Sequence, residues 1–583
     1  MSKRLYRSKT VTKADLPAQN ADVSAEPSAA DSETVVDTLP GFSVSYSAVR
    51  IAAFCYMGLP FIIFALTWLR FGMALLSATV TLFILLLTIK PSLITNIIDH
   101  RQLSRTIRLN PLAAERICIP YWTAIVVFLV AGIWVLWSGI GGAFYQSGDF
   151  PYRNAVFRDL ITNKWPVIYG GEKGMLAYYI GFWLPAASFG KFVGLFTHND
   201  AVVWNLSNTA LYLWTVIGVV LVLLMLYFNV NATSGKKILA ASLIFIFFSG
   251  MDIVGWLAGG TDGFFQRMVV ENIHIEWWAK KISFPSGHLL QYSSFTTQLF
   301  WVFNQAVMTW LCTLTLFRED NPKNYVFIGM MSLFCGPIPF YGFFVVALTR
   351  GVLFFWRARR HPAFTVLSFF SVSNLLSLVG IFPVCFAYFT GNSAATLKGD
   401  SKLLRFVPRL IFNIDNKADA GIDKRKLLLF LAFLALEFLL IALMIWWHNR
   451  KDLTFWVCMI MLCVFPLIFT GAAADFCMRA TIPALVLFCM YVIRFLFDKI
   501  HSPKQSADRL LCYVLIFFLL LGAATPIVEM SRGIYKSKEA GHIVTYNDTF
   551  KSLGSDEKAA GDIKNFTAQN YYNSTFYKYF ARR

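Results

Sequence analysis

An acidic residue just beyond an apolar run is the residue of this chain best placed to do chemistry. Asp149 lies in the segment Ser147–Asn154, a few residues after the run Tyr121–Gly141, which is long enough to span a bilayer. A carboxylate at a helix exit is within reach of water and of a lipid headgroup, so it could act as a general base on an amphiphilic substrate. The alternative is that Asp149 only ends one helix or caps the next.

An acidic and a basic residue lie four positions apart in a second short polar segment. Asp475 and Arg479 flank Phe476-Cys477-Met478. This spacing predicts a local ion pair if the segment is helical. A free Arg479 could instead bind a lipid phosphate, because a guanidinium group matches the geometry of phosphate oxygens.

A third group of polar residues lies in or beside later apolar runs. Asp252 is inside the run Ile238–Leu257, where a carboxylate is costly and should face a polar cavity or a partner. Gln298 and Asn304 lie on the next run, and interhelical hydrogen bonding explains them as well as function does.

The segment 259–291 between these runs is rich in charge, and we expect most of its charges to lie on a hydrated surface loop. Its charged and histidine residues are Asp262, Arg267, Glu271, His274, Glu276, Lys280, Lys281 and His288. His274 and Glu276 are not four residues apart, so they do not match a helical metal site.

The composition indicates a membrane protein. The 583 residues are 57% hydrophobic and only 15% charged, whereas about a quarter of the residues of soluble globular proteins are charged. The net charge of +19 lies largely in short loops between apolar runs, as the positive-inside rule expects, which argues against nucleic-acid binding. The ten cysteines show no paired spacing, which argues against disulfides and zinc.

Repeated apolar runs predict an all-α polytopic fold with about thirteen transmembrane helices. The basic loop between residues 90 and 116 is expected to be cytoplasmic, so the N-terminus lies inside and the C-terminus outside. The run Leu176–Phe196 contains Pro185 and Lys191, and we expect it to lie along the interface. Gly336-Pro337-Ile338-Pro339 predicts a break in the run 325–349.

Five regions follow from this topology. They are a disordered cytoplasmic tail (1–45), an N-terminal hairpin with a basic loop (46–116), a transmembrane core (117–360) with external loops 142–201 and 258–292, C-terminal transmembrane helices (361–529), and an external polar tail (530–583).

The residues after Asp149 have the pattern of a helix lying flat on a membrane. Val156, Phe157, Leu160 and Ile161 share one helical face. The charged residues Arg153, Arg158 and Asp159 lie mainly on the other face.

A long first external loop that starts with an acidic residue and continues into a flat amphipathic helix resembles the GT-C superfamily of polytopic glycosyltransferases. Protein O-mannosyltransferases and aminoarabinose transferases belong to this superfamily. The segment from Leu176-Ala177-Tyr178-Tyr179 to Lys191-Phe192-Val193-Gly194 resembles its interfacial helix, and the pair of short runs near Gly329–Thr349 is similar to its paired spans. The resemblance covers roughly residues 120–360. Such enzymes commonly carry a second acidic residue one or two places on, but here Phe150 and Pro151 follow.

The resemblance implies that a sugar is transferred from a polyprenyl-phosphate donor to a glycan, lipid or protein acceptor on the external face. Asp149 would be the catalytic base, and Arg479, Lys280 and Arg153 would stabilise the leaving phosphate. Asp252, His274, Glu276 and Asp475 are further substrate-binding candidates. No cofactor is required, although a divalent metal could assist.

Two alternatives remain open, a transporter or flippase of lipid-linked glycans and a polysaccharide polymerase. A transporter also needs many spans, buried charge and broken helices. No internal repeat is evident, and the polar residues gather at one face rather than at mid-membrane, which favours the transferase. The expected location is a cell membrane, most simply a bacterial plasma membrane.

Overall fold

The computed structural model describes a large part of the chain. The described residues are 40–91, 93, 107–110, 114–170, 173–260, 266–271, 273–281, 290–393, 405–406, 412–413, 421–469, 475–500, 506–541, 546, 551–555 and 565–583. Residues 1–39, Asp262, His288 and the side chain of Lys280 lie outside this description.

The described chain is mostly helical. Its principal helices are α1 (Tyr46–Trp68), α2 (Phe71–Ile89), α5 (Tyr121–Trp137), α6 (Phe150–Thr162), α7 (Leu184–Val193), α8 (Asp200–Val230), α9 (Gly235–Phe247), α10 (Asp252–Ala258), α11 (Trp278–Lys281), α12 (Phe295–Arg318), α13 (Tyr325–Cys335), α14 (Pro337–Ala358), α15 (Pro362–Phe369), α16 (Val372–Gly380), α17 (Phe382–Thr390), α19 (Lys424–Leu434), α20 (Leu440–Asn449), α21 (Leu453–Val464), α22 (Asp475–Ala480), α23 (Ile482–Lys499), α24 (Ser506–Gly522) and α25 (Ala524–Glu539).

Nine helical stretches among the described residues are long and apolar enough to cross a membrane. Two shorter apolar stretches, Tyr121–Trp137 and Leu453–Leu467, accompany them. This agrees with a helical membrane protein. The total of about thirteen crossings and the orientation of the chain stay predictions.

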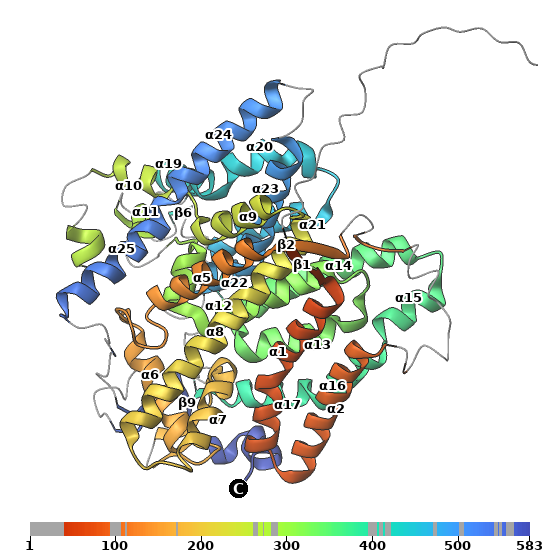
Figure 1. Cartoon of the computed structure of the whole chain (residues 1–583), viewed down its shortest axis with the longest axis vertical. Helices are drawn as coiled ribbons and strands as arrows, with labels where there is room; N and C mark the ends of the chain where they lie inside the picture. Colours follow the sequence, from red (N-terminus) through yellow and green to blue (C-terminus); the bar gives the residue numbers. More distant parts are fainter. Residues whose placement is uncertain are drawn as a thin grey trace, which may run out of the picture. The chain divides into compact units, whose positions relative to one another are not determined.

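Helix α12 lies at the centre of the bundle (Figure 1). Every one of its residues except Trp301 is buried, and it packs against α8, α13, α14 and α23. In Figure 1, α19, α20 and α24 lie on one side of the bundle, and α1, α2 and α16 lie on the other. The polar residues of α12 therefore face protein rather than lipid.

The predicted span around Asp252 is broken rather than continuous. Helix α9 ends at Phe247, and α10 begins at Asp252. Between them, a Cβ on Gly250 would lie 2.1 Å from Oε2 of Glu437, so only glycine lets the backbone approach this carboxyl so closely. Asp252 thus occupies the first turn of a new helix, a position at which a carboxylate is favoured.

Other apolar runs are also divided. The break predicted at Gly336 is confirmed, because α13 ends at Cys335 and α14 begins at Pro337. The apolar run 364–389 is divided into α15, α16 and α17. Ser371 caps α16, and prolines occupy the first turns of α15 and α17. Such residues start helices, and hydropathy alone does not register them.

Short strands tie distant segments together. Strand β1 (Gly41–Ser45) pairs antiparallel with β2 (Arg116–Pro120), and Ser43 lies opposite Cys118. Strand β4 (Gly174–Leu176) lies between β3 (Ile168–Tyr169) and β9 (Thr567–Ala568). The remaining two-residue strands are β5 (Arg405–Phe406), β6 (Phe412–Asn413), β7 (Gly421–Ile422) and β8 (Ile468–Phe469).

Helix α6 does not have the exposed polar face predicted for a surface helix. Its apolar face is buried as expected, but Arg153 and Asp159 on the other face are also buried. Tyr169 donates a hydrogen bond to Asp159, and so does the backbone N–H of Leu553. Residues distant in the sequence therefore cover the polar face of α6. The local amphipathic pattern cannot predict these contacts.

The neighbouring helix α7 is short. Its 10 residues span about 15 Å, half the thickness of a hydrocarbon core. This length agrees with an interfacial segment and excludes a single crossing by α7 alone.

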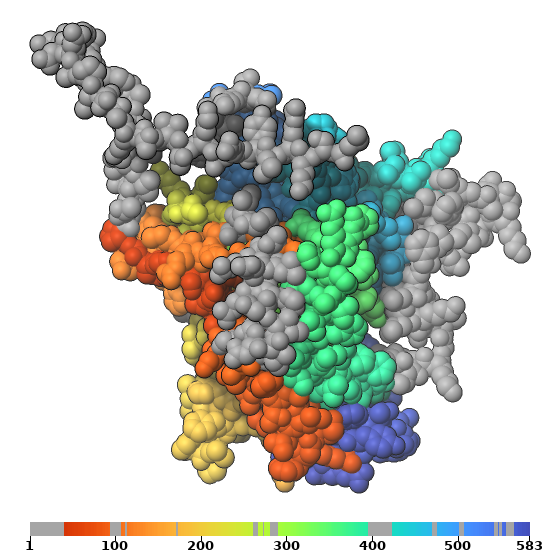
Figure 2. Space-filling model, turned by 90° about the vertical axis from the view of Figure 1, so that its right-hand side faces the viewer, coloured from red at the N-terminus to blue at the C-terminus, as the bar shows by residue number. Residues whose placement is uncertain are grey.

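The C-terminal segment is part of the fold rather than a loose polar tail. Helix α25 continues through the predicted boundary at 529/530. Arg70 donates its backbone N–H to the carbonyl of Phe580, and the side chain of Phe576 is fully buried. Figure 2 shows this segment (dark blue) beside α2 (orange). Sparse aromatic residues, not a continuous apolar run, hold it in place.

Candidate functional site

The loop after α5 places Asp149 at the start of α6. Asp149 occupies the N-cap position of α6, but its side chain makes no capping hydrogen bond. Instead its Oδ2 accepts a hydrogen bond of 2.8 Å from Nη2 of Arg153, while the Asp149 side chain stays 50% exposed. The structure thus argues against capping as the role of this side chain, although the ion pair is a second structural explanation.

Arg153 is enclosed and not fully paired. Its side chain is 7% exposed, and its guanidinium carbon lies 5.8 Å and 5.7 Å from the ring centres of Phe150 and Phe303. Its Nη1 is buried and has no hydrogen-bond partner in the described part of the chain. A buried N–H donor without an acceptor is costly, so this atom is available to an anionic group.

Arg479 forms the predicted ion pair with Asp475 but does not use all of its N–H donors. Its Nη2 lies 3.3 Å from Oδ1 of Asp475, and its Nη1 donates to the hydroxyl of Tyr179 at 3.4 Å. Its Nε is buried, and no described residue accepts a hydrogen bond from it. Burial lowers the pKa of Arg479, but the charges of Asp475, Tyr179, Tyr178 and Asp149 raise it above its usual range. The guanidinium therefore stays cationic.

Two adjacent tyrosines connect the arginines. The hydroxyl of Tyr178 is hydrogen-bonded to that of Tyr179, which also accepts a 3.1 Å bond from Nε2 of Gln305 on α12. Burial raises the pKa of Tyr178 far above its usual value, whereas Arg479 and Arg153 both act to lower it. Both arginines therefore lie within electrostatic reach of one phenol. We call Asp149, Arg153, Tyr178, Tyr179 and Arg479 the arginine–tyrosine site.

His274 belongs to a second, buried network, and the expectation of a hydrated loop is wrong for it. Its Nδ1 lies 3.3 Å from Oε1 of Glu529, which also accepts a 2.7 Å bond from Nη1 of Arg532. Trp301 donates its indole N–H to the other oxygen of Glu529 at 3.1 Å. Aromatic rings from α12 and from the segment before α11 enclose the histidine, so the loop folds inward.

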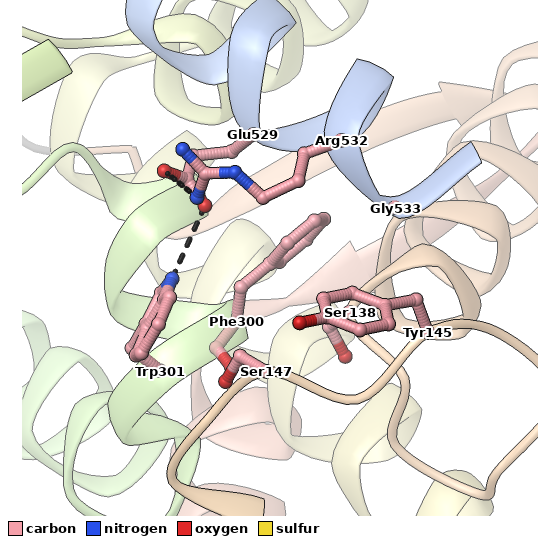
Figure 3. A pocket seen from close by; sticks show the side chains of 8 residues that line it. All are labelled: Ser138, Tyr145, Ser147, Phe300, Trp301, Glu529, Arg532 and Gly533. Atoms are coloured by element: carbon pink, nitrogen blue, oxygen red, sulfur yellow. Dashed lines mark hydrogen bonds and ion pairs between the residues drawn. The ribbon is translucent and has the colours of Figure 1, made fainter. Parts of the chain in front are cut away.

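A pocket separates this network from the loop that carries Asp149 (Figure 3). Glu529 and Arg532 come from α25, and Trp301 from α12. Ser138, Tyr145 and Ser147 line the opposite side. Ser147 lies two positions before Asp149, so the pocket adjoins the start of the arginine–tyrosine site along the chain.

Three carboxyl groups form a third cluster. The carboxyls of Asp252 and Glu437 are both buried and interact electrostatically, and one oxygen of each has no hydrogen-bond partner among the described residues. Oδ2 of Asp252 accepts hydrogen bonds from Thr525 (2.6 Å) and Ser249 (3.1 Å), which confirms that this residue faces polar partners.

Glu276 is the third member of this cluster and is 1% exposed rather than on a wet surface. It accepts hydrogen bonds from Nε2 of Gln291 and from the backbone N–H of Ser294. Burial, reinforced by the carboxylates of Asp252 and Glu529, raises the pKa of Glu276 to about 8.

Gln298 and Asn304, the amide residues of α12 considered from the sequence, differ in their hydrogen bonding. Gln298 donates to the carbonyl of Ser293 and accepts from the indole of Trp310, which supports the structural explanation. Both side-chain polar atoms of Asn304 are buried and have no hydrogen-bond partner within the described ranges. It lies beside Gln305, which contacts the arginine–tyrosine site.

The predicted candidates therefore divide into separate groups. Asp149, Arg153, Asp475 and Arg479 come together, whereas Asp252, His274 and Glu276 belong to the other two clusters. Glu437 and Glu529 were not predicted from the sequence. Glu437 is the lone charge within the run 427–447, which is itself a signal of function. Glu529 and Arg532 lie on opposite sides of the boundary predicted between residues 529 and 530.

The described residues contain no group of three or more His, Cys, Asp or Glu side chains arranged to hold a metal ion. All ten cysteines are free. The chain matches no family model, no curated protein and no solved structure.

Proposed function

We propose that this protein is a membrane glycosyltransferase that moves a sugar from a polyprenyl-phosphate carrier to an acceptor hydroxyl on the external face. The observation that carries the proposal is the arginine–tyrosine site. The half-exposed carboxylate of Asp149 is paired with Arg153 and lies within electrostatic reach of Arg479, and each of these guanidinium groups has a buried N–H without an acceptor among the described residues.

The arrangement supplies both halves of a displacement at the anomeric carbon. Asp149 accepts the proton of the acceptor hydroxyl as its oxygen forms a bond to the anomeric carbon. The bond from that carbon to the phosphate oxygen breaks, and the electron pair leaves with the polyprenyl phosphate. A single displacement inverts the configuration at the anomeric carbon.

The arginines stabilise the charge that develops on the leaving group. Nη1 of Arg153 and Nε of Arg479 can donate to phosphate oxygens without first giving up a protein acceptor. Donors fixed in a buried setting stabilise developing charge more strongly than donors in water do. Asp475 and Tyr179 hold Arg479 in place by 3.3 Å and 3.4 Å contacts.

A transporter of lipid-linked glycans is the second candidate, and the Asp252–Glu437 pair favours it. Both carboxyls lie within helical stretches long enough to span a membrane, where ionisable pairs often serve proton relays. The break between α9 and α10 is also a feature of transporters.

Reconstitution into proteoliposomes distinguishes the two candidates. We expect radiolabelled sugar from a polyprenyl-phosphate donor to appear in a glycolipid, polymer or protein, with release of the polyprenyl phosphate. Protein-free liposomes are the control. Movement of intact donor between leaflets without cleavage of the sugar–phosphate bond would contradict the transferase and favour the transporter.

A further inference from the structure

Three arginines converge at the end of the bundle away from the arginine–tyrosine site. Arg318 ends α12, Arg350 lies in the second half of α14, and Arg494 lies near the end of α23. The thirteen residues between Gln305 and Arg318 correspond to about 20 Å along a helix. The two groups of arginines are therefore separate sites.

Each of these arginines lies beside an aromatic ring. The guanidinium carbons of Arg350 and Arg494 lie 4.5 Å and 5.1 Å from the ring centre of Phe317. Arg318 lies 4.7 Å from the ring centre of Tyr46. Arg494 is within electrostatic reach of both Arg350 and Arg318.

The guanidinium groups of Arg318, Arg350 and Arg494 each donate to a backbone carbonyl, which carries no charge. Arg318 donates to the carbonyl of Ala114 at 2.6 Å, Arg350 to that of Phe317 at 2.7 Å, and Arg494 to that of Asn229 at 2.7 Å. Within the described part of the chain, no carboxylate lies within 4.0 Å of any of the three guanidinium groups. Their mutual repulsion is therefore not cancelled by direct ion pairs.

The nearest acidic groups are engaged elsewhere. Glu319 pairs with Arg50, with contacts of 2.5 Å and 3.0 Å. Asp320 accepts from the backbone of Asn110 at 3.0 Å and lies 3.9 Å from Arg108.

Asp452 accepts from Tyr491 at 2.7 Å and from the first turn of α21, and Glu115, which also acts on Arg318, lies 3.3 Å from Arg108. Neutralising the three arginines would therefore require a carboxylate to leave an existing partner.

Two of the arginines keep buried donors unused. Arg318 is 6% and Arg350 is 3% exposed, and Nε of each has no hydrogen-bond partner among the described residues. Arg494 is only partly buried. Unpaired buried cations are costly and normally coordinate an anion.

We propose that Arg318, Arg350 and Arg494 form a second anion site that binds a phosphate group, supplied by an anionic lipid headgroup or by free phosphate. Guanidinium groups bind phosphate oxygens through paired, charge-assisted hydrogen bonds. Three such groups from three helices would join the ends of α12, α14 and α23 when the phosphate binds. The proposal does not depend on glycosyl transfer.

The test is the thermal midpoint of the full chain in phosphatidylcholine nanodiscs at constant ionic strength. One arm adds inorganic phosphate, with chloride as the ionic control. The other replaces part of the phosphatidylcholine with phosphatidic acid. Because a ligand that binds only the folded state raises Tm, we expect a rise in at least one arm. A rise with phosphate identifies a free anion, and a rise with phosphatidic acid alone identifies a lipid headgroup.

Arg494→Gln is expected to weaken the response by about tenfold to hundredfold in ligand concentration, the effect of losing one charge-assisted hydrogen bond. Arg450→Gln is the matched control, because Arg450 is exposed and stacks on Trp447. Arg494→Lys keeps the charge and should fold even if the glutamine variant does not, with an intermediate response. No rise in either arm, or an equal rise in both arginine-494 variants and wild type, would show that the arginines are structural only.

Discussion

At the scale of single residues, unpaired donors distinguish the candidate site from ordinary ion pairs. Arg479 and Arg153 each satisfy part of their hydrogen-bonding capacity within the protein and leave one buried N–H free. The i, i+4 pairing of Asp475 with Arg479 was predictable from the sequence. The contribution of Tyr179 was not, because it lies 300 positions away from Arg479 in the chain.

Removing the charge of Arg479 should slow glycosyl transfer without unfolding the protein. We expect Arg479→Gln to lower kcat by about 10²–10³, the effect of losing one donor to developing charge. Arg479→Lys should retain part of the rate, because it keeps the charge but not the forked geometry. Arg359→Gln, which alters an exposed arginine stacked on Trp356, is the control. Equal rates for all three variants in the donor assay would contradict the role of Arg479.

Glu276 makes stability depend on pH. Its pKa is raised to about 8 in the folded protein by burial and by Asp252 and Glu529, against about 4.3 in an unfolded chain. Between these values the folded form keeps a proton that the unfolded chain releases, so raising the pH favours unfolding.

We therefore expect Tm in detergent to fall from about pH 5 to pH 8, and Glu276→Gln to flatten this fall. Measuring Tm across this range for both proteins tests the effect. Parallel curves for the two proteins would show that Glu276 does not bind the extra proton.

At the scale of elements, hydropathy located most of the helices but not their interruptions. The α12 span and the break at Gly336 followed from the sequence. The division of the runs around Asp252 and 364–389 did not, because glycine approaches and helix caps decide it. The helix predicted after Asp149 forms as α6, but the prediction that its polar face is exposed was wrong. Strand β3 and residues near Leu553 cover that face.

A glycine of α14 controls how closely this helix approaches α22, which carries Arg479. A Cβ on Gly342 would lie 2.0 Å from the carbonyl oxygen of Ala480. We expect Gly342→Ala to displace α22 and to cost about 1–3 kcal/mol, with a lower Tm and slower transfer. Gly72→Ala is the matched control, because a Cβ on Gly72 meets nothing within 4 Å. If the two variants behaved alike, the close approach would not position the site.

At the scale of the whole molecule, the C-terminal segment completes the helical core. The sequence predicted a polar tail because residues 530–583 lack a continuous apolar run. The structure places Phe576 against Phe64 and Tyr388, with ring centres 6.0 Å and 5.1 Å apart. Contacts between residues hundreds of positions apart cannot be derived from local periodicity.

Phe576→Ala should destabilise the protein by about 3–5 kcal/mol, the usual cost of removing a buried phenylalanine ring. Tyr579→Ala should be nearly neutral, because Tyr579 is 67% exposed in the same short helix. Thermal unfolding of both variants checks the difference. Equal stability would contradict the integration of this segment into the fold.

The most direct test of glycosyl transfer is the rate of label transfer from polyprenyl-phosphate sugar in proteoliposomes containing wild type, Asp149→Asn or Asp200→Asn. Asp200 is an exposed carboxylate outside the arginine–tyrosine site. We predict that transfer is lost in Asp149→Asn at unchanged protein level and retained in Asp200→Asn. Equal transfer by wild type and Asp149→Asn would exclude Asp149 as the catalytic base.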